Sequence, residues 1–120
     1  MSTTSTLPPF NPSDPAGIDD FLTEEERAIR DAVRRLAQEI EPKVATWFEE
    51  GRIDDPRALM KRFGDMGLLG MHLEGYGCAG MSAVDYGLAC IELEACDSGI
   101  RSMVSVQGSL AMFAIWKFGS

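Results

Sequence analysis

The sequence predicts an all-α protein, a small antiparallel bundle of four to five helices. Two capping boxes, beginning at Thr23 and Ser82, stand directly before apolar runs. Asp55-Pro56 is a third helix-start signal, because proline is favoured at the first position of a helix. Apolar residues then recur at intervals of three and four residues, and no segment is convincing as a strand. These signals together favour helices packed on helices.

Composition limits the class of partner. The chain has 120 residues, 45% of them apolar, which is enough for one small domain with a core. Its formal net charge of −8 argues against nucleic acid and against an anionic membrane surface as partners. We therefore expect neither a nucleic-acid-binding nor a membrane-bound protein.

The cysteines and the termini indicate a cellular compartment. Cys78, Cys90 and Cys96 are odd in number and form no C-x-x-C pair, which favours free thiols in a reducing compartment. The longest nearly apolar run, residues 110–115, is far below the ~20 residues of a membrane span. No signal or transit peptide is recognisable, so a cytoplasmic location is expected.

The first half of the chain predicts a leader and two helical regions. Residues 1–20 are rich in Ser, Thr and Pro and predict a flexible leader before a helical domain over residues 21–120. Thr23 begins a helix, which Pro42 is expected to end or kink before a further piece up to Gly51. The apolar stripe of this helix is Ile29, Val33, Leu36 and Ile40. A short helix then follows Asp55-Pro56.

The second half predicts two more helices. Ser82 begins the first of them, and Asp97-Ser98-Gly99 breaks it. Its predicted apolar stripe is Val84, Leu88, Ile91 and Ala95. Residues 96–119 predict a long helix that is buried nearly all round, with one narrow polar stripe. The single histidine, His72, has no recognisable partner and is expected to be structural or exposed.

Gly75-Tyr76-Gly77-Cys78-Ala79-Gly80 has the G-x-G-x-x-G spacing of a dinucleotide-binding loop. That function requires a strand before the loop within a β-α-β unit. Only residues 68–73 stand in the place of such a strand, and they are few and bracketed by glycines. A glycine-rich turn between helices is the preferred interpretation.

The polar stripe of the last helix begins at Arg101. Ser105 and Ser109 follow it at i+4 and i+8, and Ser102 stands beside it. A guanidinium beside an apolar run requires an anion, and a carboxylate matches its forked geometry. That anion is either a ligand or an internal partner, for which Glu94 is the candidate. Both possibilities remain open on the residues alone.

Several segments resemble the N-terminal α-domain of the acyl-CoA dehydrogenases, and the resemblance runs from about Phe21 to the end. They are LTEEERAIRDAVR (22–34), MGLLGM (66–71), EGYGCAG (74–80) and YGLACIELEACDSGIRSMVSVQGSL (86–110). The motifs GYGCAG and DSGIRSMVSVQ are similar to those of the glutaryl-CoA dehydrogenase branch. The resemblance thus implies an all-helical domain of a flavoenzyme.

What the resemblance implies is specific. FAD removes a hydride from Cβ of glutaryl-CoA, a glutamate base takes a proton from Cα, and loss of carbon dioxide gives crotonyl-CoA. Electron-transfer flavoprotein accepts the electrons, and members are usually homotetramers. In this branch the substrate's far carboxylate meets an arginine and serine that match Arg101 and Ser102, with Ser105 next on that face and Glu94 beside the arginine.

The chain also departs from this family in length. Relatives continue into a β-domain and a C-terminal helical domain that carries the catalytic base, and neither is present in these 120 residues. We therefore expect the chain alone to be inactive, with the apolar faces of residues 96–119 exposed. The alternative is a non-catalytic helical interaction module with the same layout.

Overall fold

The computed structural model describes residues 7–120, and this part of the chain contains helices and no strand. The elements are a 3-10 helix η1 (Ile18–Phe21), α1 (Glu24–Glu50), α2 (Pro56–Asp65), α3 (Ala83–Cys96), α4 (Ser98–Ser105), a π-helical segment η2 (Val106–Met112) and α5 (Phe113–Phe118). The predicted all-α class and the predicted number of helices are confirmed.

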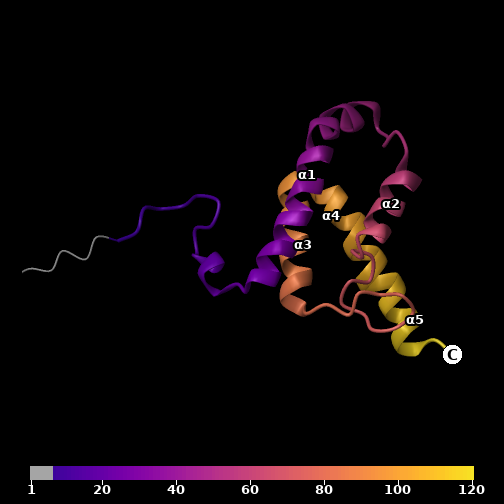
Figure 1. The fold of residues 1–120 in the computed structure, drawn as a ribbon. Coiled ribbons are helices and arrows are strands. Elements are labelled where there is room, and N and C mark those ends of the chain that lie inside the picture. Colours follow the sequence, from indigo (N-terminus) through magenta and orange to yellow (C-terminus); the bar gives the residue numbers. More distant parts are fainter. Residues whose placement is uncertain (1–6) are drawn as a thin grey trace, which may run out of the picture.

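The chain reverses direction between successive helices (Figure 1). α1 and α3 run side by side in the same direction, while α2 and the continuous run α4–η2–α5 return the opposite way. The shortest dimension of the molecule is 19 Å, about two helix diameters. The bundle is therefore two layers thick, and α3 lies between α1 and α4 with both of its sides in contact.

The core lies where these helices meet. Phe63, Leu93 and Leu36 are at most 2% exposed, and each such side chain stabilises the fold by roughly 1.5–3 kcal/mol. The core cluster is Val33, Leu36, Ile40, Leu59, Phe63, Leu68, Met71, Ala89, Leu93, Ile100 and Val104. Every helix from α1 to α4 contributes side chains to this core. Each loop between them therefore has a packed helix at both of its ends.

α1 begins as predicted and ends later than predicted. The Thr23 hydroxyl accepts from the Glu26 backbone N–H, and the Glu26 carboxylate accepts from the Thr23 backbone N–H. Pro42 lies inside the helix, so of the two expected outcomes, an end or a kink, the end does not occur, and the helix continues to Gly51, where the second helical piece was expected to stop. Proline frees the carbonyl of Gln38, but both residues are exposed, so water can replace the lost hydrogen bond. Gly51, in the left-handed conformation, ends the helix.

α2 and α3 begin at the predicted caps. The Asp55 carboxylate accepts from the Ala58 backbone N–H at 2.9 Å, and Ser82 and Asp85 form a capping box. Of the predicted apolar stripe of α3 only Leu88 is buried, because Val84 and Ile91 are 49% and 56% exposed and Ala95 is exposed too. A single stripe cannot describe a helix with neighbours on two sides. The buried residues of α3 are Asp85, Leu88, Ala89, Glu92 and Leu93.

The end of the predicted leader is ordered against α1. The Asp14 carboxylate accepts from the backbone N–H groups of Ile18 and Asp19 at 2.8 and 2.9 Å. Asp19 in turn pairs with Arg30, and with Arg27 at 3.4 Å. The Arg30 hydrogen bond holds the pKa of Asp19 below its ordinary value. The composition of residues 1–20 did not indicate this contact, and residues 1–6 lie outside the described part.

One ion pair joins α1 to α3 directly. Arg34 donates from Nε and Nη2 to the two carboxylate oxygens of Glu92, at 2.9 and 2.8 Å. The Glu92 side chain is only 11% exposed, whereas that of Arg34 is 45% exposed. The hydrogen bond that Arg34 donates to Glu92 raises the pKa of Arg34, which keeps the pair charged. This forked geometry fixes the position of α3 along the axis of α1.

Replacing Glu92 by glutamine should destabilise the chain, because it removes the charge and leaves one arm of Arg34 without an acceptor. We expect the free energy of unfolding to fall by roughly 1–3 kcal/mol in urea denaturation. The matched control is Asp65→Asn in the exposed Lys61–Asp65 pair, which should change it by at most about 0.5 kcal/mol. Equal effects of the two substitutions would contradict this role.

The contact of η1 with α1 should be lost in acid. Because the pKa of folded Asp19 lies below its unfolded value, the contact stabilises the fold above about pH 4 and is lost as the pH falls through the folded pKa. Amide resonances of residues 18–21, followed by NMR, should shift in that range. Asp19→Asn should show the released positions at neutral pH, and unchanged resonances in acid would refute the contact.

Candidate functional site

The turn from α3 to α4 brings Glu94 opposite Arg101. The Asp97 carboxylate caps α4 by accepting from the Ile100 backbone N–H at 3.0 Å. The chain therefore turns back within a few residues, and Arg101 Nε donates to Glu94 Oε2 at 2.6 Å. This bond, with the charge of Glu94, raises the pKa of Arg101, so the guanidinium stays charged. The internal partner predicted from sequence is present.

Of the predicted polar stripe, Ser105 also reaches the guanidinium. Its Oγ accepts from Arg101 Nη1 at 3.0 Å. Ser102 is half-buried next to Arg101 but is not one of its hydrogen-bond partners. The Ser109 hydroxyl turns back and donates to the Ser105 carbonyl. Arg101 Nη2 has no partner among residues 7–120, and the side chain is 33% exposed.

Two residues of this site were missed from the sequence, Tyr86 and Cys90. With Glu94 they stand at i, i+4 and i+8 on α3, the same spacing that marked Arg101, Ser105 and Ser109. Both lie on the face of α3 that carries Glu94, and burial raises the pKa of both Tyr86 and Cys90. We call the six residues Tyr86, Cys90, Glu94, Arg101, Ser105 and Ser109 the polar seam. Matching polar spacing on two consecutive helices was the available signal.

The glycine-rich loop does not form a dinucleotide site in the described structure. Gly75, Gly77 and Gly80 have φ values of 81°, 81° and 63°, and Tyr76 between them has a φ of 53°. These left-handed positions explain the glycines as turn residues. No strand precedes the loop, so the β-α-β unit that this function requires is missing from residues 7–120.

The sequence and the fold match those of a known enzyme family. A model of the acyl-CoA dehydrogenase N-terminal domain matches residues 23–120. The chain belongs to the acyl-CoA dehydrogenase family. This domain is similar to a crystal structure of glutaryl-CoA dehydrogenase from Mycobacterium smegmatis, with 62% identity and a TM-score of 0.84 over 90% of this chain and 28% of that chain.

A second structure agrees. A glutaryl-CoA dehydrogenase from Mycobacterium smegmatis in complex with FADH2 is 54% identical, with a TM-score of 0.82 over 87% of this chain and 27% of that chain. The acyl-CoA dehydrogenase domain described here thus spans less than a third of the length of either structure. Membership of this family favours an enzyme segment over an unrelated interaction module.

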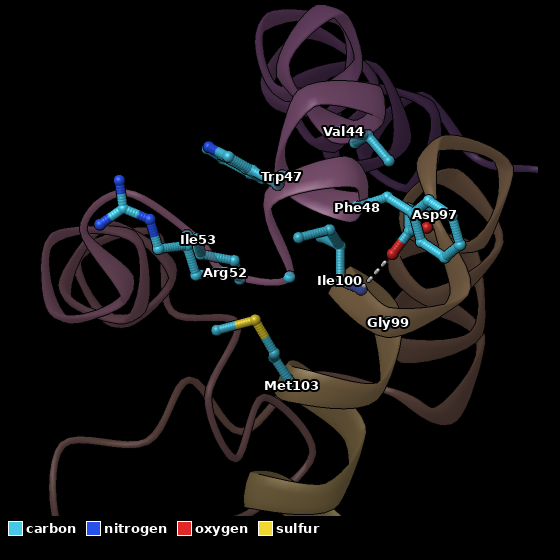
Figure 2. Close-up of a pocket in the computed structure, with 10 residues that line it drawn as sticks. Val44, Trp47, Phe48, Arg52, Ile53, Asp97, Gly99, Ile100 and Met103 are labelled. Carbon is cyan, nitrogen blue, oxygen red and sulfur yellow. Dashed lines mark hydrogen bonds between the residues drawn. The ribbon is translucent and has the colours of Figure 1, made fainter.

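Arg101 does not line any of three cavities on the surface of this domain. One of them, of about 570 Å³, is open and lies on another side of α4, where Ile100 and Met103 face the end of α1 near Trp47 and Phe48 (Figure 2). Two smaller cavities, of about 350 and 310 Å³, lie beside η1 and beside α5. None of these three cavities includes a residue of the polar seam, and the side chains of Arg101 and Glu94 are 33% and 49% exposed.

The prediction that the last helix is buried nearly all round is wrong beyond Ser105. Leu110, Ile115 and Phe118 are 65%, 72% and 81% exposed, because no described element packs over η2 and α5 on that side. The apolar exposure expected for this segment is thus present. Within residues 7–120 no helix has the length and apolarity to cross a bilayer, and no cluster of side chains has the composition of a metal site.

The π-helical segment is fixed by a close backbone contact. A Cβ atom added at Gly108 would lie 3.1 Å from the backbone nitrogen of Gly70. That distance is tighter than an ordinary van der Waals contact, and a backbone atom cannot rotate away. His72 follows Gly70 and packs on Tyr86, with ring centroids 4.6 Å apart. The loop before α3 therefore supports both sides of the polar seam.

Gly108→Ala should destabilise the domain by about 1–3 kcal/mol, because the two backbones must separate. The matched control is Gly87→Ala in α3, where an added Cβ meets nothing within 4 Å. That substitution should be neutral or stabilise by up to about 1 kcal/mol, through helix propensity. Thermal unfolding of both variants checks this, and a Gly108→Ala variant as stable as the original chain would rule out the contact.

Proposed function

We propose that this chain forms the N-terminal helical part of a flavin-dependent glutaryl-CoA dehydrogenase, which oxidises and decarboxylates glutaryl-CoA to crotonyl-CoA. In this proposal the polar seam forms the end of the acyl pocket and binds the substrate's terminal carboxylate. Support comes from two relatives with that printed name, at 54% and 62% identity, and from the arrangement of Arg101.

The proposal rests on one observation: the protein accepts hydrogen bonds from only some of the N–H donors of Arg101. Arginine has five N–H donors in a rigid fork. In Arg101 one donor is used by Glu94 and one by Ser105, and no described residue accepts from Nη2. The two internal bonds fix the side-chain rotamer, and the remaining edge matches the two oxygens of a carboxylate. A guanidinium held in this way is preorganised for an incoming anion.

Roles for the neighbouring residues follow from their positions. Ser102, half-buried beside Arg101, supplies a hydroxyl donor to the bound carboxylate, and Ser105 both holds Arg101 and borders the same space. Glu94 orients the guanidinium without neutralising the ligand-facing edge. An acyl chain with a methyl end leaves the free edge of this guanidinium desolvated and without an acceptor, which disfavours the wrong substrate.

The cofactor of the proposed enzyme is FAD, which supplies hydride acceptance at Cβ. We assign no flavin contact and no catalytic base to this chain. Electron-transfer flavoprotein as electron acceptor and a homotetrameric assembly belong to the same proposal.

The test is substrate selectivity in the full-length enzyme that contains this chain. Arg101→Ala should lower kcat/KM for glutaryl-CoA by roughly 100-fold or more, about 3 kcal/mol, because a desolvated charge pair is lost. The value for butyryl-CoA, which has no terminal carboxylate, should change by less than about threefold.

Two further variants complete this test. Arg57→Ala, at an exposed arginine of α2, should leave both substrates unaffected. Arg101→Lys should recover only part of the glutaryl-CoA activity, since lysine lacks the fork. A comparable loss with both substrates in Arg101→Ala would show that Arg101 is structural and would refute the proposed carboxylate site.

A further inference from the structure

A row of alternating charges runs from the leader, over α1, to α3. Asp19 of η1 pairs with Arg30 of α1, and Arg30 also donates from Nε to Asp31 Oδ1 at 2.9 Å. Asp31 Oδ1 lies 3.9 Å from Nη1 of Arg34, which forms the forked pair with Glu92 of α3. We call these five residues the charge row. Both of its ends are carboxylates, and every member between them faces an opposite charge on each side.

The middle of the charge row is built into one face of α1. Arg30, Asp31 and Arg34 stand within one turn of the helix, at spacings that bring their side chains together. The Arg30 side chain is only 16% exposed and pairs with two carboxylates. Exposed ion pairs contribute most to stability when they share members, because ordering one side chain then serves two contacts. The pairs of the charge row therefore support one another.

The end of the leader is separated from α3 by an open space. Residues 14–22, which we call the strap, face α3 across the cavity of about 350 Å³, lined by Ile18 from the strap and by Glu92 from α3. Within residues 7–120 the ion pairs of the strap go to Arg27 and Arg30 of α1, and none goes to α3. An electrostatic effect of the strap on α3 is therefore carried by the charges of α1.

The balance of charge shows how such an effect is transmitted. Asp19 compensates the positive charge of Arg30. The hydrogen bond to Glu92 raises the pKa of Arg34, and the like charge of Arg30 acts in the opposite direction. Once Asp19 is neutral or detached, the charge of Arg30 is less compensated and repels Arg34 more strongly. The fork that fixes α3 on α1 then weakens.

We propose that the strap locks the position of α3 along α1 through the charge row, so that strap attachment and the Arg34–Glu92 fork stabilise each other. This inference is independent of the proposed enzymatic function. Salt that screens the charge row releases the strap and loosens α3 together, so the leader acts as a salt-sensitive latch. Because α3 also carries Glu94, the latch bears on the register of the polar seam.

The experiment measures amide hydrogen exchange by NMR in the 120-residue chain and in Asp19→Asn, which keeps the size of the side chain and removes its charge. Amides of residues 88–94 in α3 should exchange about two- to fivefold faster, the factor for one partly exposed ion pair. Amides of residues 60–64 in α2 should be unchanged. The matched control is Glu39→Gln, which breaks an ion pair of similar exposure between α1 and Arg62 of α2 and should leave exchange in α3 unchanged.

A double-mutant cycle tests the charge row itself. Asp19→Asn should accelerate exchange in α3 no further once Glu92 is replaced by glutamine, because the connection is already broken. In the unsubstituted chain, roughly 1 M NaCl should accelerate residues 18–22 and 88–94 but not 60–64, since it shortens the Debye length to about 3 Å. This measurement requires no variant to fold. Multiplying effects in the cycle, unchanged exchange in α3, or equal acceleration of α2 and α3 would overturn the proposed lock.

Discussion

The position of α3 between α1 and α4 is the constraint on which the rest of the structure depends. One side of α3 buries Leu93 and Glu92 toward α1, where Arg34 holds the carboxylate in a forked ion pair. Its other side carries the polar seam toward α4. A helix with neighbours on both sides cannot rotate or slide without breaking one of the two contacts, so the register of Glu94 against Arg101 is fixed by packing far from either residue.

The polar seam combines two requirements that usually conflict. A guanidinium near an apolar helix needs compensation, which Glu94 and Ser105 provide. Complete compensation would leave nothing for a ligand. Because Arg101 uses only part of its fork internally, the same ion pair that makes the charge tolerable also holds the remaining donors in a fixed direction. In the proposed enzyme this arrangement favours a substrate with a second carboxylate.

Glycine has its clearest structural role where the loop before α3 meets η2. Gly70 and Gly108 allow two backbones to approach more closely than any side chain would permit. The contact occurs in the π-helical segment, directly after the serine that holds Arg101. π-Helical turns are frequent at functional sites because they change the direction of the residues that follow. Here the segment places Ser109 so that its hydroxyl donates to the Ser105 carbonyl.

Local signals in the sequence determined where helices begin, since caps such as Thr23 and Ser82 act within a single turn. They also identified Arg101 with Glu94 as a pair, because the two residues are separated only by a tight turn. Tertiary structure alone decided which sides of α3 are buried, that α1 continues through Pro42, and that Tyr86 joins the seam. Those features depend on contacts between distant segments, and periodicity within one segment carries no information about how many neighbours a helix will have.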